Sequence, residues 1–327
     1  MADKKRYIIT GASGHIGNNL VRYINKTEPE SEIVVLTRRK ITRELNGTNC
    51  VQIKGNLDDK NFLKENIKKG DIIVHLAAFI DLTDKQKETT FRVNFDYTKT
   101  LCDFAKMNRN RFIYVGSVDG IYKDKSIDII EEPTEYYPEK VEGNYGKSKA
   151  LAAQYVLDCM NGDNEFSAAI VLPSAVMGIN DYKPSAVGKI ILDCVNKRAE
   201  FGIRGGYNFV DVNDVVFVIF SLMKNDNKGQ YIVSGESVTV KEMYTKINSA
   251  LGVKKRPVMI PLFLVKTLLP FVKMLNKITL KSLTESHNYS CEKSKKELMF
   301  SPTDIDKTIN DTVNWFIANK NLFNRSK

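Results

Sequence analysis

Short hydrophobic runs alternate with longer amphipathic stretches through the first half of the chain. The runs are rich in β-branched and aromatic residues and are mostly continuous; they cover residues 7–9, 33–36, 51–53, 72–74 and 112–115. Continuous apolar runs are typical of strands that are buried on both faces of a parallel sheet. The stretches between them have the length and polarity of helices, at 16–26, 59–69 and 90–107. This alternation predicts an α/β fold of the Rossmann type, with a doubly wound parallel sheet.

The second half of the chain keeps this pattern only in part. Two further strands are predicted at 168–172 and 231–233, but after Pro173 helical and irregular segments punctuated by Gly and Pro dominate. We therefore expect a smaller substrate-binding region beside the nucleotide-binding domain. The predicted division assigns 1–173 and 206–235 to the Rossmann domain, and 174–205 and 236–327 to the substrate-binding region.

The most apolar stretch of the sequence, residues 257–280, has two interpretations. Lys266, Lys273, Pro261 and Pro270 interrupt it, so it is a poor candidate for a membrane-spanning helix. It favours one or two amphipathic helices that cover the substrate cleft. The alternative is a surface that contacts a membrane or takes up an apolar substrate.

Charge and cysteine content limit the classes of partner. Among 327 residues, 49 Lys and Arg outnumber 39 Asp and Glu, so the net charge is +10, but the basic residues are scattered among acids. We expect a solvated basic surface and no nucleic-acid partner. The five cysteines are far apart and form no CxxC, the three histidines lack metal-ligand spacing, and no apolar signal region precedes the first strand. These features predict reduced thiols, a cytoplasmic location and no metal.

A glycine-rich loop joins the first predicted strand to the first predicted helix. Gly11 permits a tight turn, Gly14 lets the backbone approach a pyrophosphate, and Gly17 lets the helix pack close to the strand. The free N–H groups at the start of the helix would then face the phosphates. The dinucleotide-binding residues expected in this loop are Gly11, Ser13, Gly14, His15, Ile16 and Gly17.

The end of the second predicted strand indicates which dinucleotide binds. NAD-binding folds usually place an acid about 20 residues after the loop, where it bonds the ribose hydroxyls. Here the strand ends with Thr37, followed by Arg38 and Arg39, and no acid is present. Because a guanidinium group binds phosphate with two parallel hydrogen bonds, the pair favours the 2′-phosphate of NADP over NAD.

A Tyr-x-x-x-Lys spacing provides the candidate chemistry. Tyr145 and Lys149 lie four residues apart at the start of a strong helical run, so both side chains share one helix face. A free tyrosine has a pKa near 10, and a nearby ammonium is expected to lower it. Tyr145 could then donate a proton to a carbonyl as a hydride arrives, or remove one from an alcohol in the reverse direction.

The GxxGxxG spacing and the motifs that follow it resemble the extended short-chain dehydrogenase/reductase family. Segments 55–58, 75–78, 173–178, 208–215 and 289–298 are similar to family motifs in the family's order. The resemblance implies a Rossmann fold and further cofactor contacts at Asn56, Leu57, Leu76, Ala77, Ala78 and Pro173. Asn56 stands where the family more often has Asp, and its amide can still form hydrogen bonds to adenine.

The same resemblance implies two further catalytic residues. Ser117, at the end of the fifth strand, resembles the serine whose hydroxyl bonds the substrate oxygen and stabilises charge in the transition state. Asn94 matches a helix asparagine that would hold a water relaying protons to Lys149. Two helices, the one after Thr90 and the one after Tyr145, resemble the pair that forms a homodimer interface in relatives.

Within this family the sequence favours a reductase or dehydrogenase of an apolar small molecule, similar to dihydroflavonol reductases and 3β-hydroxysteroid dehydrogenases. The alternative is a nucleotide-sugar epimerase or dehydratase with tightly held NAD. Such members often carry Arg before the proline that corresponds to Pro173, where this chain has Leu172. A non-catalytic NADP sensor is a third possibility, which the presence of Tyr145 disfavours.

Overall fold

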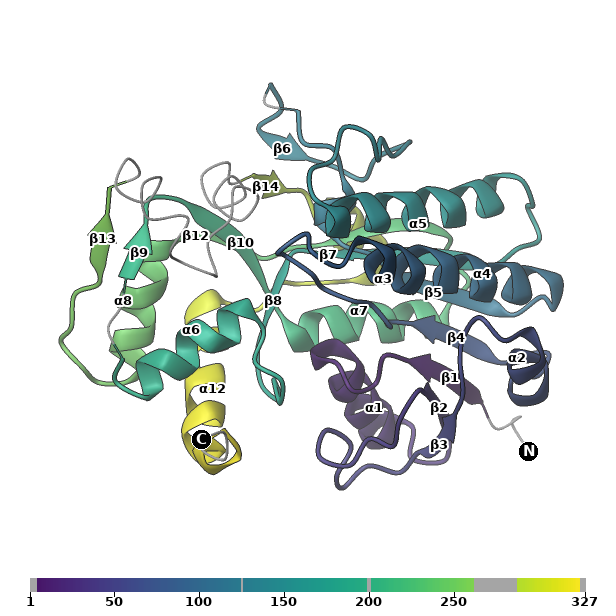
Figure 1. The fold of residues 1–327 in the computed structure, drawn as a ribbon, viewed down its shortest axis with the longest axis horizontal. Coiled ribbons are helices and arrows are strands. Elements are labelled where there is room, and N and C mark those ends of the chain that lie inside the picture. The colour runs from purple at the N-terminus through teal and green to yellow at the C-terminus, as the bar shows by residue number, and fades with distance from the viewer. Residues whose placement is uncertain (1–4, 125, 199–200, 262–286, 324–327) are drawn as a thin grey trace.

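Seven parallel strands form the central sheet of the protein (Figure 1). The structure is a computed structural model that describes residues 5–124, 126–198, 201–261 and 287–323. The strand order is β11-β7-β5-β4-β1-β2-β3, and each neighbouring pair is parallel. This sheet confirms the predicted Rossmann fold and all seven predicted strands. They are β1 (Arg6–Thr10), β2 (Glu32–Thr37), β3 (Val51–Lys54), β4 (Ile72–His75), β5 (Arg111–Val115), β7 (Ala168–Pro173) and β11 (Gly229–Val233).

Helices cover both faces of the sheet, which explains why the strands are apolar throughout. Along β1, Ile8 belongs to a core shared with α4 and α5, whereas Tyr7 and Ile9 belong to a second core with α1 and α7. Figure 1 shows α4 and α5 on one side of the sheet and α1 and α7 on the other. The helices are α1 (His15–Thr27), α2 (Lys60–Asn66), α4 (Tyr97–Met107), α5 (Asn144–Asn161) and α7 (Val212–Lys224).

The helix predicted over 90–107 is interrupted by a turn of π-helix. The observed order is α3 (Lys87–Phe91), the π-turn η1 (Arg92–Asp96) and then α4. A π-turn accommodates one extra residue in a helix and frequently occurs at functional sites. Asn94, a predicted catalytic residue, lies within it.

The smaller part of the molecule contains short strands that the sequence pattern did not predict. β8, β10 and β12 form a three-stranded sheet, while β9 pairs with β13 and β6 with β14. A third core joins this part, with contributions from α6, α8 and α12. The strands are β6 (Ile129–Ile130), β8 (Ala175–Met177), β9 (Phe201–Ile203), β10 (Gly206–Asp211), β12 (Glu236–Thr239), β13 (Val258–Ile260) and β14 (Asn288–Tyr289). The helices are α6 (Ala186–Val195), α8 (Val240–Ala250), α11 (Glu292–Leu298) and α12 (Ile305–Ala318).

Two predictions concern this part of the molecule and have different outcomes. The helical interpretation of 257–280 is wrong at its start, where Val258–Ile260 pairs as strand β13, and residues 262–280 lie outside the described residues. The boundary at 206 stays a prediction: β10 lies in the small sheet, whereas β11 joins the main one. No helix within the described ranges is both long and apolar enough to cross a membrane.

The glycine-rich turn after β1 is fixed by close contact with the segment after β4. Gly11 has φ +74°, and a Cβ there would lie 2.5 Å from the backbone nitrogen of Ala77. Gly47 has the same φ, but a Cβ there would meet no atom within 4 Å. The two glycines therefore share a backbone conformation and differ in their surroundings.

We expect Gly11→Ala to destabilise the fold much more than Gly47→Ala. Both substitutions incur the left-handed strain of about 1 kcal/mol, but only the first forces two backbone segments apart, at a further cost of about 3 kcal/mol. Urea denaturation of both variants measures the difference. Equal losses of unfolding free energy would show that the turn can relax away from Ala77.

Candidate active site

The predicted functional residues gather at one edge of the main sheet. Gly11 follows β1, Arg38 follows β2, Asn56 follows β3 and Ser117 follows β5, while Pro173 ends β7. Because parallel strands end at the same edge, the fold brings these residues into one row. This edge is where ligands bind in open α/β sheets.

Helix α5 carries the two central side chains at its N-terminus. It begins at Asn144, after Gly143 with φ 74°, and the backbone N–H of Asn144 donates to Asp84 Oδ1 at 2.6 Å. A carboxylate is favourable at this end of the helix dipole. Tyr145 and Lys149 follow one turn apart, on the same face.

Lys149 is buried, and its side-chain ammonium group bonds the end of strand β5. Only 3% of the residue is exposed, and its Nζ donates to the carbonyl oxygen of Val115, the last residue of β5, at 2.9 Å. Burial disfavours the charged form and lowers the pKa of Lys149 to about 7. The bond to Val115 therefore holds the ammonium near the end of β5, two residues before Ser117.

Tyr145 and Ser117 come together, but the phenol does not have the lowered pKa that the sequence predicted. Burial and then the charge of Asp119 raise the pKa of Tyr145, and the nearby Ser117 hydroxyl lowers it less. The expectation of a lowered pKa is therefore wrong in this structure, because the desolvation of the phenolate outweighs the favourable contacts. At neutral pH the phenol stays protonated.

The charge of Asp119 is partly balanced. Its Oδ1 lies 3.3 Å from the ammonium of Lys123, one turn further along the loop that follows β5. The backbone N–H of Asp119 also donates to Ser117 Oγ at 3.1 Å, so the same short turn orients the serine hydroxyl. The turn is the 3₁₀ segment η2 (Val118–Gly120), with Ser117 as its N-cap.

Asn94 links the segment after β4 to helix α5. It is fully buried; its Oδ1 accepts from the Phe79 backbone N–H at 2.7 Å, and its Nδ2 donates to Ser148 Oγ at 2.9 Å. Ser148 precedes Lys149, so Asn94 lies beside the predicted catalytic helix. Its role in a proton relay stays a prediction.

A buried chain of hydrogen bonds reaches Asn94 from β1. Thr98 Oγ1 donates to the Asn94 carbonyl at 2.7 Å, so it accepts from His75 Nε2 at 3.0 Å. His75 Nδ1 then accepts from Thr10 Oγ1 at 2.7 Å, which assigns the tautomer. Burial lowers the pKa of His75 to about 3, so the ring is neutral. Sequence reasoning did not find the roles of Thr10 and Thr98; the available signal was a threonine at the end of the apolar strand β1 and a second on the buried face of the amphipathic helix α4.

The glycine-rich loop fits a dinucleotide pyrophosphate. Gly14 precedes α1, and no side chain of the described residues caps that helix, so its first N–H groups can bind an anion. A Cβ on Gly17 would lie 2.5 Å from the Gly11 carbonyl oxygen, so the helix and the turn need glycine to approach this closely.

The remaining predicted cofactor residues differ in exposure. His15 Nε2 bonds the carbonyl oxygen of Ile179 at 2.9 Å, so its ring is turned toward the smaller part of the molecule. Leu57 and Pro173 are buried, whereas Asn56 and Ala78 are exposed. The other members are partly buried: Ser13, Ile16, Leu76 and Ala77.

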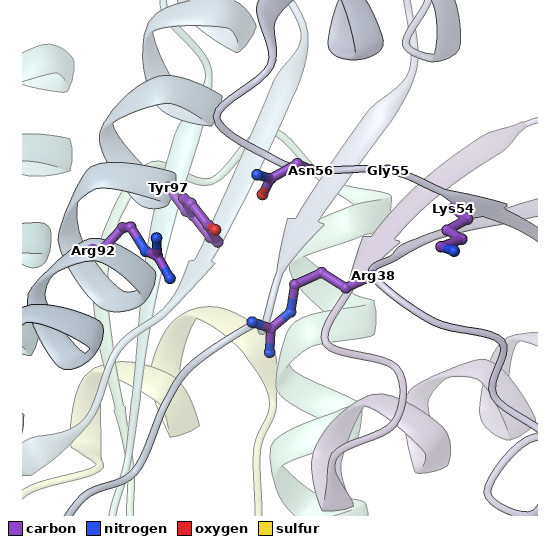
Figure 2. Close-up of a pocket in the computed structure, with 6 residues that line it drawn as sticks. All are labelled: Arg38, Lys54, Gly55, Asn56, Arg92 and Tyr97. Atoms are coloured by element: carbon purple, nitrogen blue, oxygen red, sulfur yellow. The ribbon is translucent and has the colours of Figure 1, made fainter. Parts of the chain in front are cut away.

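The two arginines after β2 line two separate cavities. Figure 2 shows the first, of about 430 Å³, into which the side chains of Arg38 and Arg92 extend beside Asn56 and Tyr97. Its lining contains three cationic side chains and no carboxylate. The second cavity, of about 340 Å³, is lined by Ser13, Arg39, Lys40, Ile41, Thr42, Arg43, Glu44 and Lys183. Both cavities have the charge to hold an anion.

Comparison with known proteins places these features in a family. The model of the NAD dependent epimerase/dehydratase family matches residues 7–234. The chain is 26% identical to sterol demethylase protein B of Methylococcus capsulatus, covering 94% of this chain and 97% of that protein. It is 24% identical to a sterol-4-alpha-carboxylate 3-dehydrogenase, decarboxylating, of Dictyostelium discoideum, covering 74% and 75%.

Nucleotide-sugar proteins are also similar to the chain. It is 28% identical to an ADP-L-glycero-D-manno-heptose-6-epimerase of Cupriavidus pinatubonensis, over 64% of this chain and 67% of that protein. Among solved structures, gox2253 superposes with a TM-score of 0.83 at 25% identity, covering 97% of this chain and 99% of that one.

Replacing Lys149 with methionine is expected to stabilise the protein in a pH-dependent way. The unfolded lysine stays charged up to about pH 10.4, whereas burial lowers the folded pKa to about 7. The buried charge therefore costs stability fully below about pH 7, and the cost vanishes as pH rises toward about 10. Melting curves should show Lys149→Met more stable by at least about 2 °C near pH 6.5, with a shrinking difference at higher pH.

Lys147, on the same helix but only partly buried, provides the control. Lys147→Met should change the melting temperature little at any pH. If Lys149→Met instead shows a constant difference from pH 6.5 to 10, the charge on Lys149 is not buried in solution.

Proposed function

The chain belongs to the NAD dependent epimerase/dehydratase family, and from that membership we propose that it is an NADP(H)-dependent oxidoreductase. It reduces a ketone or aldehyde of an apolar small molecule, or oxidises the corresponding alcohol. The observation that carries the proposal is the placement of Tyr145 near Ser117 at the carboxyl edge of the sheet, one helical turn from the buried Lys149.

The proposed chemistry assigns each of these residues a task. The nicotinamide, when bound, supplies or accepts the hydride. Tyr145, whose phenol is protonated at neutral pH, donates its proton to the carbonyl oxygen during reduction. Ser117 Oγ bonds the same oxygen and stabilises the charge that develops on it. Lys149 binds the cofactor ribose, and Asn94 positions the water that supplies Lys149 with protons.

Several observations support an apolar substrate. Large apolar side chains are exposed on the segments that follow β4 and Ser117: Ile80, Leu82 and Tyr122, with 65%, 39% and 40% of their surfaces accessible. Exposed apolar groups beside a site of this kind favour an apolar ligand. Two of the relatives reported above are named for sterols.

A nucleotide-sugar epimerase or dehydratase is the alternative, supported by the similarity to the heptose epimerase. Its activity would require tightly held NAD that is regenerated in each turnover. The two proposals are distinguished by incubating the purified protein with panels of apolar ketones and of nucleotide sugars. Net oxidation of NADPH supports the reductase, whereas product formation without added cofactor supports the alternative.

We also propose a homodimer through α4 and α5 and a cytoplasmic location. The dimer rests on the resemblance of this helix pair to the interface of family members. Light scattering tests it directly, since a monomer mass would exclude it. The location rests on the five cysteines, which are all free thiols.

Tyr145→Phe is expected to abolish turnover while leaving cofactor binding intact. Loss of a general acid lowers kcat by at least about 100-fold, and the aromatic ring is retained. Tyr136 is the matched control, because it has the same spacing to Lys140 but its hydroxyl bonds Gln230. Initial-rate assays of NADPH oxidation should show a kcat near the wild-type value for Tyr136→Phe. A comparable loss of kcat in both variants would exclude Tyr145 as the general acid.

Exchanging both arginines after β2 for glutamine is expected to weaken NADPH binding selectively. Each charge-assisted bond to the 2′-phosphate contributes about 1.5–3 kcal/mol, so the KM for NADPH should rise about 10-fold or more while that for NADH stays unchanged. The single variants Arg38→Gln and Arg39→Gln show which cavity is used. Arg109→Gln, which removes an exposed arginine paired with Asp163, is the control. An equal rise in both KM values would contradict the NADP assignment.

A further inference from the structure

A short segment from the smaller part of the molecule crosses onto the glycine-rich loop and helix α1. This crossing segment, residues 178–183, leaves β8 and leads toward α6. Three polar side chains near the start of α1 hold its backbone. The bonds are His15 Nε2 to Ile179 O at 2.9 Å, Asn19 Nδ2 to Ile179 O at 3.1 Å and Asn18 Nδ2 to Asn180 O at 3.1 Å.

An aromatic residue, Tyr182, anchors the crossing segment near its C-terminal end. The ring of Tyr182 lies 5.9 Å from the guanidinium carbons of both Arg22 and Arg43, and 5.3 Å from the ring of Trp315 on α12. Arg43 also donates to the Tyr182 carbonyl oxygen at 2.6 Å. The segment therefore connects the loop after β2, helix α1 and the smaller part of the molecule.

These contacts carry Lys183 to the wall of the second cavity. Its Nζ lies 2.9 Å from Glu44 Oε1 and donates to the backbone oxygen of Ser13 at 3.3 Å. The cavity also receives Arg39, Lys40 and Arg43, so four cationic side chains face one carboxylate. Glu44 is 7% exposed, and its bond with Lys183 helps to keep its pKa below the ordinary value. An excess of positive charge in a concave site favours a multiply charged anion.

The position of the second cavity indicates which anion would bind there. The cofactor pyrophosphate belongs at the N-terminus of α1, beyond Gly14. The second cavity instead extends from Ser13 to the loop after β2, where the ribose hydroxyls of a bound dinucleotide are recognised. A phosphate bound at this place would be the one carried by the adenosine ribose, and not a phosphate of the pyrophosphate or of the nicotinamide half.

We propose that Lys183 is a ligand of the ribose 2′-phosphate, so that a residue of the smaller part of the molecule helps to select NADP. The proposal rests on the NADP preference proposed above. Glu44 holds the ammonium at the cavity wall, and its own charge opposes the phosphate. Removing Lys183 and removing the charge of Glu44 should therefore have opposite effects, which a purely structural ion pair would not produce.

Calorimetric titration of the full chain with adenosine 2′,5′-bisphosphate and 5′-AMP tests this, since the probes differ only in the 2′-phosphate. Lys183→Met should reduce the preference for the bisphosphate about 10-fold. Glu44→Gln should increase it several-fold, and Lys183→Arg should retain it. The affinity for 5′-AMP should stay constant throughout. Lys189→Met, an exposed lysine on α6, controls for the loss of one positive charge.

A wild-type preference in Lys183→Met, with a reduced one in Arg39→Gln, would overturn the role of Lys183 while leaving the NADP assignment intact. If the wild-type protein binds the two probes equally, the proposed NADP preference itself fails. Hydrogen exchange adds a second readout: the bisphosphate, but not 5′-AMP, should protect the amides of the crossing segment. Equal protection by both probes would count against a contact between Lys183 and the 2′-phosphate.

Discussion

The parallel direction of all seven strands is the constraint on which the site depends. Because the strands end at the same edge, residues at the ends of β1, β2, β3, β5 and β7 meet there although they lie far apart in the sequence. Both faces of the sheet are buried under helices, so this edge is also where the polar groups at the strand ends can reach a ligand. The short turn after β5 and the start of α5 then set the geometry of Ser117 and Tyr145.

The sequence predicted the main sheet well because its strands are continuous apolar runs. The strands of the smaller part, of two to six residues, carry too little pattern to separate them from loops. Their pairing, such as β10 with β8, comes from tertiary contacts between distant segments. The sequence did not predict the π-turn at Asn94 either, because the composition of residues 92–96 is that of an ordinary helix.

Residue types and spacing located Tyr145, Lys149 and Ser117, but not their electrostatics. A pKa depends on burial and on every nearby charge, and residue spacing alone does not weigh the burial of Tyr145 against the charges around it. The adjacent Arg38 and Arg39 likewise look like one anion site in the sequence. In the structure they line different cavities, at the bend that follows β2.

The π-turn between α3 and α4 also affects how residues 87–107 align with the same helix in homologous chains. One extra residue rotates everything beyond it by about 100° relative to a regular helix. The buried residues Thr90 and Leu101 therefore lie in different helical phases, so a single helical wheel cannot display both faces correctly. Homologous chains that lack the extra residue would align only with a one-residue gap within 92–96. A deletion there would turn Asn94 away from Ser148 while leaving the composition of the helix almost unchanged.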